Sequence, residues 1–150
     1  MKARRVREGP DVDTGWLLDT HVWIWMMTGR TDRLGVALRR SLEQTRRTYG
    51  LYISELSVYE LAIKVARGRL ALQGRVEDLA ADTERLPGLR FVPFSRAAML
   101  EAATLRGAPT DPFDRGIAAT AIVLGLSLVT ADRQLTTSVQ GSARLRVVRV

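Results

Sequence analysis

The sequence predicts an α/β protein, in which a central parallel sheet of about five strands is covered by helices on both faces to give three layers. Three observations support this class. Short segments rich in β-forming residues alternate with longer segments of helical periodicity. The short segments are almost wholly apolar, as expected of strands buried on both faces. The length of 150 residues suits a single domain.

The expected elements follow one another in regular alternation. The strands are the apolar runs at 16–19, 51–54, 90–93, 126–130 and 145–150. Helical periodicity covers 20–28, 33–48, 56–67, 74–86, 95–105 and 112–125, with a further short helix at "RQLTT", residues 133–137. Residues 1–14 have no such pattern, so we expect a flexible N-terminal arm over 1–14 and one folded domain over 15–150.

Composition excludes several classes of protein. The chain has no cysteine, which excludes disulfides and thiolate metal sites and fits a reducing cytoplasm. We expect no membrane association, because no apolar run approaches the ~18 residues of a membrane span, and the basic N-terminus lacks the apolar core of a secretory signal. The net charge of +7 favours a nucleic acid or another polyanion as partner. Only Lys2 and Lys64 are lysines, a bias that GC-rich codon usage explains equally well.

Two aspartates follow expected strands directly. Asp19 ends "WLLD" and Asp132 follows "LSLVTA". In a parallel α/β sheet, ligands bind beyond the carboxyl ends of the strands. Each aspartate also suits the N-cap of the next helix. A charged carboxylate behind a buried strand costs several kcal/mol unless it is paired or bound to a cation, so both remain candidates for function.

Glu60 is the acid of interest in the helical stretch "SELSVYELAIKVARG". It lies between Tyr59 and Leu61 on a helix that is apolar over much of its surface. The structural interpretation is an ion pair with Lys64, four residues later. Glu55, at the start of the same helix, is expected to be an end-of-helix charge.

The segment "DPFD" has a strong structural interpretation. Asp111 suits an N-cap, Pro112 the first helical residue and Asp114 the third position of a capping box. Asp114 nevertheless opens a largely apolar helix at the mouth of the sheet. From the residues alone, a structural and a functional role of Asp114 therefore both stay open.

Together these acids predict a metal site. Asp19, Glu60, Asp114 and Asp132 lie at strand ends or in early helical turns, which a parallel sheet brings together. Carboxylates in one cleft repel one another unless a cation is present. Oxygen ligands without cysteine, in a chain with one histidine, indicate Mg²⁺ or Mn²⁺ rather than Zn²⁺.

The segments "LLDTHVWIW", "SVYELAIKVARGRL", "DPFDRGIAATA" and "LVTAD" occur in the order and approximate spacing of PIN-domain proteins. The chain resembles in particular the VapC-type toxins of bacterial toxin–antitoxin systems, over residues 16–132. The resemblance implies an α/β/α PIN-like fold and a Mg²⁺- or Mn²⁺-dependent endoribonuclease. It also implies a cognate antitoxin as partner, RNA as substrate and a homodimer.

Carried over residue by residue, the acidic quartet of the family falls on Asp19, Glu60, Asp114 and Asp132 as metal ligands and catalytic residues. In the family pattern the third acid comes just before an apolar "IAATA" stretch, so the resemblance selects Asp114 over Asp111 and leaves Asp111 to help as a cap or through a water. The family often has a small hydroxyl residue that orients a carboxylate or a water. Thr20 and Thr130 stand in such places, and ordinary capping explains them too. His21 matches the family's "DTH" and is expected to be structural rather than a ligand. The chain departs from close relatives by lacking a histidine shortly before "DPFDR".

The contacts with partners are less sharply indicated. Arg67, Arg69 and Arg115 are candidates to guide the RNA backbone or are plain surface charges. The stretch "HVWIWMMTG" has Trp23, Trp25, Met26 and Met27, which suit either an antitoxin interface or, more readily, the core.

Two other functions compete with the nuclease. "DVDTG", from Asp11 to Gly15, imitates the signature of haloacid-dehalogenase-type phosphatases. That motif needs an apolar strand before it, and here the strand comes after it. A non-catalytic RNA-binding or regulatory module of the same fold is the stronger alternative, although all four acids are present.

Overall fold

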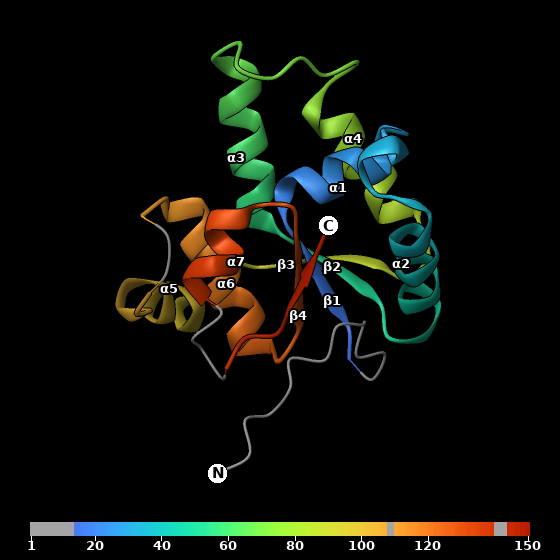
Figure 1. The fold of residues 1–150 in the computed structure, drawn as a ribbon. Coiled ribbons are helices and arrows are strands. Elements are labelled where there is room, and N and C mark those ends of the chain that lie inside the picture. Colours follow the sequence, from blue (N-terminus) through green and yellow to red (C-terminus); the bar gives the residue numbers. More distant parts are fainter. Residues whose placement is uncertain (1–13, 108–109, 140–143) are drawn as a thin grey trace.

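A single parallel sheet forms the centre of the molecule (Figure 1). The computed structural model describes residues 14–107, 110–139 and 144–150. Within these residues the sheet has five strands in the order β3-β2-β1-β4-β5. Their bounds are β1 Trp16–Leu18, β2 Leu51–Ser54, β3 Leu89–Val92, β4 Ser127–Thr130 and β5 Val147–Arg149. The expected parallel sheet of five strands is confirmed.

The strand order places β1 at the centre of the sheet. The chain proceeds outward from β1 through β2 to β3, then returns to place β4 on the other side of β1. Leu18 lies in register with Ile53 of β2 and with Val129 of β4, so the three strands end at one edge. The reversal of strand order between β1 and β4 marks the place where α/β sheets bind their ligands.

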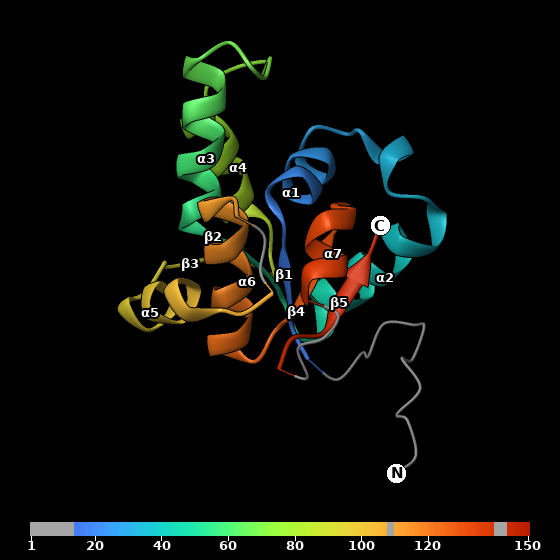
Figure 2. The same cartoon turned by 60° about the vertical axis from the view of Figure 1, so that its left-hand side comes forward.

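Helices cover both faces of the sheet (Figures 1 and 2). Their bounds are α1 Thr20–Met27, α2 Val36–Thr48, α3 Glu55–Ala66, α4 Val76–Arg85, α5 Arg96–Thr104, α6 Pro112–Leu124 and α7 Arg133–Val139. Helices α5, α6 and α7 lie on one face, and α1, α2 and α4 lie on the other. Helix α3 extends beyond the carboxyl ends of the strands and contacts α1, α4 and α6. The predicted three layers are therefore present.

The core is divided by the sheet into two apolar clusters. Alternate residues of β1 point to opposite faces, so Trp16 and Leu18 pack with Trp23 of α1, whereas Leu17 packs with Ile117 of α6. All five of these side chains are fully buried. Apolar residues on both faces explain why the strand segments read as continuous apolar runs.

One expected helix begins later than predicted. The sequence predicts a helix over 33–48, but the structure has a short 3₁₀ helix at Thr31–Arg33 and then α2 from Val36. Gly35 between them has a φ of +66°, a left-handed conformation that an α-helix cannot contain and that glycine adopts readily. Apart from Thr14, the predicted arm over 1–14 lies outside the described residues.

None of the helices in the described ranges combines the length and the hydropathy needed to cross a bilayer.

Candidate functional site

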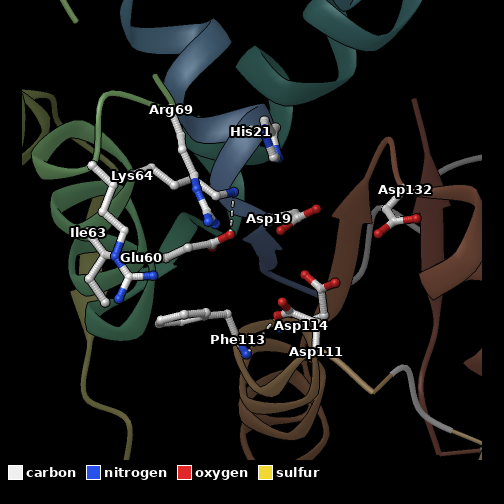
Figure 3. Close-up of a pocket in the computed structure, with 11 residues that line it drawn as sticks. Asp19, His21, Glu60, Ile63, Lys64, Arg69, Asp111, Phe113, Asp114 and Asp132 are labelled. Carbon is white, nitrogen blue, oxygen red and sulfur yellow. Dashed lines mark hydrogen bonds and ion pairs between the residues drawn. The ribbon is translucent and has the colours of Figure 1, made fainter. Parts of the chain in front are cut away.

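A pocket of about 220 Å³ opens beyond the carboxyl ends of the central strands (Figure 3). All four acids of the predicted quartet line it, together with Asp111. The remaining lining residues are His21, Ile63, Lys64, Arg67, Arg69 and Phe113. Acids that are distant in the sequence, from position 19 to position 132, therefore face one space.

Asp19 is held firmly at the end of β1. Its backbone N–H donates to the carbonyl of Val129 at 2.9 Å, which ties the end of β1 to β4. One side-chain oxygen accepts from the backbone N–H of Thr20, and the other accepts from the hydroxyl of Thr130, both at 2.7 Å. Asp19 is thus the predicted N-cap of α1. It is 4% exposed and forms no salt bridge within the described residues.

Glu60 is the second buried acid, at 6% exposure. One side-chain oxygen accepts from the Thr20 hydroxyl at 2.5 Å, and the other lies 2.7 Å from the ammonium of Lys64. The Thr20 hydroxyl also lies 2.9 Å from the hydroxyl of Ser57, one turn before Glu60 on α3. The predicted Glu60–Lys64 ion pair is present, and Glu55 is exposed in the first turn of α3, as expected.

The "DPFD" segment has the predicted capping geometry. One side-chain oxygen of Asp111 accepts from the backbone N–H of Phe113 at 2.9 Å and of Asp114 at 3.0 Å. Pro112 is the first residue of α6. The cap fixes the start of α6 and so directs Asp114 toward Asp19, as Figure 3 shows. Asp114 is half-buried, whereas Asp111 is exposed.

Asp132 enters the pocket from the side opposite Glu60 (Figure 3). Its side chain accepts from the backbone N–H groups of Gln134 at 2.8 Å and Leu135 at 3.3 Å, so it caps α7 as predicted. Its own backbone N–H donates to the Thr130 hydroxyl at 3.0 Å. Thr130 therefore connects Asp19 and Asp132 directly.

The clustering of like charges changes the protonation of two acids. Burial is the largest of the effects that together raise the pKa of Asp114 to about 7, and the negative charges of Asp19, Asp111, Glu60 and Asp132 supply the rest. Burial also raises the pKa of Asp19, against the hydrogen bonds from Thr130 and Thr20 that lower it. A bound cation would favour the ionised form of these carboxylates and so would offset the effects of burial and of like charge.

The donor set suits a hard divalent cation, since it consists of carboxylate oxygens. As the side chains lie, however, no three acid, histidine or cysteine side chains within the described ranges are arranged to hold one ion. In this arrangement Asp19, Glu60 and Asp132 accept hydrogen bonds from the protein. The pocket therefore fits the cation in chemistry, while its carboxylates are held by partners of the protein itself.

One wall of the same pocket is basic. Lys64, Arg67 and Arg69, at the end of α3 and just beyond it, line the pocket. Figure 3 shows Lys64 and Arg69 across the pocket from Asp132. Arg115, also predicted as a guide for RNA, is placed elsewhere. Its guanidinium donates to the backbone carbonyls of Ala102 and Leu105, so it holds the end of α5 against α6.

The aromatic residues of α1 divide between core and surface. Trp23 is fully buried, as the core interpretation expects, and its indole N–H donates to Thr83 of α4 at 2.9 Å. Trp25, Met26 and Met27 are partly buried against the same cluster. His21 is exposed at the rim of the pocket with its ring 6.1 Å from that of Trp25.

Sequence reasoning missed two contributors to this site. Phe113 lines the pocket. The Ser57 hydroxyl lies within hydrogen-bond distance of the Thr20 hydroxyl, which donates to Glu60. Ser57 lies three residues before Glu60 on one helix, so helical spacing places it on the same face. No sequence signal identifies Phe113 as a pocket residue, because a residue between a proline and an acid can equally lie on the surface.

Comparison with known proteins connects the fold to a family. A family model described as the PIN domain matches residues 16–137. A structure of VapBC2 from Rickettsia felis, bound to a DNA fragment from the promoter, has 19% sequence identity and a TM-score of 0.65, covering 91% of this chain and 98% of that one.

Two further structures are similar. VapBC-5 from Mycobacterium tuberculosis, a member of the VapBC family of toxin–antitoxin systems, has 21% identity and a TM-score of 0.57, over 91% of this chain and 99% of that one. FitAcB from Neisseria gonorrhoeae has 26% identity and a TM-score of 0.55, over 89% and 96% of the two chains. Among curated proteins, no sequence matches significantly.

Proposed function

This chain belongs to the PIN-domain family, and from that membership we propose that it is a Mg²⁺- or Mn²⁺-dependent endoribonuclease acting as the toxin of a toxin–antitoxin pair. The observation that carries the proposal is the pocket, which Asp19, Glu60, Asp114 and Asp132 line together with the bases Lys64, Arg67 and Arg69. Acids and bases around one space suit a phosphodiester, whose cleavage needs charge neutralised on several oxygens.

In this proposal the four acids would hold the cation. When bound, the cation supplies a water of lowered pKa and neutralises negative charge at the scissile phosphate. The protein contributes orientation, because Thr130 fixes the Asp19 carboxylate and Thr20 fixes that of Glu60. Arg67 and Arg69 are positioned to bind the RNA backbone, because they line the same pocket and arginine suits phosphate.

The first test is RNA cleavage in the presence of Mn²⁺ by the wild type, Asp19→Asn and Asp114→Asn. We expect each variant to lose at least about 100-fold in rate, since even residues that only support metal ligands are worth 10–100-fold. Glu55→Gln, which neutralises an exposed acid on α3 outside the pocket, is the control and should cleave like the wild type. Variants that cut as fast as the wild type would refute the site. A wild type that binds RNA without cutting it would favour the non-catalytic module.

The proposed partners are a cognate antitoxin and a second copy of the chain. The similar structure from Mycobacterium tuberculosis belongs to a toxin–antitoxin family, which supports an antitoxin here. Trp25, Met26 and Met27 of α1 are the candidate contact surface, because they are only partly buried. The absence of cysteine remains consistent with the proposed cytoplasmic location.

A further inference from the structure

Lys64 makes a contact that sets it apart from the other bases of the pocket. Its ammonium lies 2.7 Å from one side-chain oxygen of Glu60, and the second oxygen accepts from Thr20. The Glu60 side chain is 8% exposed and that of Lys64 is 30% exposed. Both oxygens of a proposed metal ligand are therefore already engaged by the protein.

Helix geometry favours this ion pair. Glu60 precedes Lys64 by four residues on α3, which is the better order of charges along a helix. Lys64 also lies in the last turn of α3, where the helix dipole attracts a cation. Figure 3 shows the Lys64 side chain turned back to Glu60 rather than out of the pocket. The structure therefore has Lys64 and Glu60 joined as an ion pair at the edge of the pocket.

The type of base at position 64 is also informative. Of the 23 basic residues in the chain, only Lys2 and Lys64 are lysines. Arginine holds a carboxylate through two parallel hydrogen bonds, whereas lysine is a compact charge on a flexible stem. Glu60 is therefore paired with a lysine, whose contact with a carboxylate is easier to break than that of an arginine.

We propose that Lys64 is a tethered counter-ion, which neutralises Glu60 in the cation-free protein and must leave it before that carboxylate can bind a divalent cation. The inference rests on the proposed metal-dependent function. When only a fraction of the molecules is competent to bind, the apparent Kd rises by the inverse of that fraction. The strength of the Lys64–Glu60 ion pair should therefore set the affinity of the pocket for the cation.

Isothermal titration of Mn²⁺ into the full chain, freed of metal with EDTA and dialysed, tests this competition. We expect Lys64→Met, which keeps the apolar stem, to bind Mn²⁺ about ten-fold more tightly than the wild type. Lys64→Arg, whose guanidinium can donate two hydrogen bonds to Glu60, should bind Mn²⁺ at least about three-fold more weakly than the wild type.

Arg67→Met is the matched control. Arg67 lies three residues after Lys64 and lines the same pocket, but it forms no ion pair with an acid of the described ranges. Removing this exposed and screened charge should tighten Mn²⁺ binding by no more than about two-fold. The difference between Lys64→Met and Arg67→Met therefore isolates the ion pair from the general loss of positive charge.

The outcomes separate the inference from the function on which it rests. If the wild type binds Mn²⁺ but Lys64→Met gains no more than Arg67→Met, or Lys64→Arg binds as well as the wild type, the counter-ion is refuted and the metal site stands. If neither the wild type nor Lys64→Met binds Mn²⁺, both proposals fail. Lys64→Met leaves Glu60 buried without a cation, so circular dichroism must show that it is folded; if it is not, Lys64→Arg decides.

Discussion

Four of the five acids that line the pocket have a structural task beside any chemical one. Asp19 caps α1, Asp132 caps α7 and Glu60 pairs with Lys64 on its own helix. A sequence pattern that indicates a cap therefore does not argue against a ligand, because one carboxylate has two oxygens and several lone pairs. Only Asp111 is exposed and engaged wholly as a cap at the start of its helix.

Asp114 gives the sharpest prediction at the scale of a single residue. Its pKa of about 7 in the folded protein lies above the ordinary value of 3.8, so the native state binds more protons than the unfolded chain between these values. The free energy of unfolding of the cation-free protein should fall as pH rises through this window, and the loss persists above it. Asp114→Asn removes this titration.

Urea unfolding in EDTA at pH 4 and pH 8 measures the effect. At pH 8 the variant should be more stable than the wild type by roughly 1–2 kcal/mol, less than the full pKa shift implies because Asp114 is only half-buried. At pH 4 the difference should nearly vanish. Glu55→Gln is the control for loss of a charge, and equal stabilities of wild type and Asp114→Asn at pH 8 would contradict the raised pKa.

At the scale of the element, two variants at the start of α6 distinguish the capping role of Asp111 from the effect of its charge. Asp111→Ser keeps a capping oxygen and removes the carboxylate, whereas Asp111→Ala removes both. We expect Asp111→Ala to lower the free energy of unfolding by about 1 kcal/mol and Asp111→Ser to change it little. Thermal unfolding of the two variants checks this difference.

RNA cleavage by the same two variants then decides the role of Asp111 in the pocket. Because its task is to fix α6, Asp111→Ser should cleave at close to the wild-type rate. A loss in Asp111→Ser as large as that in Asp114→Asn would make Asp111 part of the reaction rather than a support for it.

The strands were more predictable than the helix boundaries. The strands are short runs rich in β-forming residues, and β1 and β4 are buried throughout, so their places are evident from the sequence. The start of α2 was not evident, because it depends on the left-handed backbone conformation of Gly35. A glycine in a helical pattern is compatible both with a continuous helix and with a helix that begins after it. The Thr20–Glu60 and Thr130–Asp19 hydrogen bonds join residues far apart in the sequence and depend on the packed positions of α1, α3 and β4.

At the scale of the whole molecule, the proposed antitoxin makes a direct prediction. Co-expressed with the product of the neighbouring open reading frame, the chain should co-purify with it and lose its RNA cleavage. Trp25→Ala should weaken this association, since the Trp25 ring is partly exposed on α1, whereas a substitution of buried Trp23 would disturb the core instead. Size-exclusion chromatography reports both the complex and the proposed homodimer. A chain that stays monomeric and active beside its neighbour would argue against a toxin–antitoxin pair.

The position of β1 at the centre of the sheet also has a consequence for synthesis on the ribosome. One neighbour of β1 is β4, which begins about 110 residues after β1 ends. At about 5–20 residues per second, one edge of β1 stays without its partner for roughly 5–20 s. During that interval Thr130 and Asp132 do not yet exist, so a chain still being made has no complete pocket. If the proposed activity is correct, a nascent chain therefore gains it only after Asp132 has been synthesised.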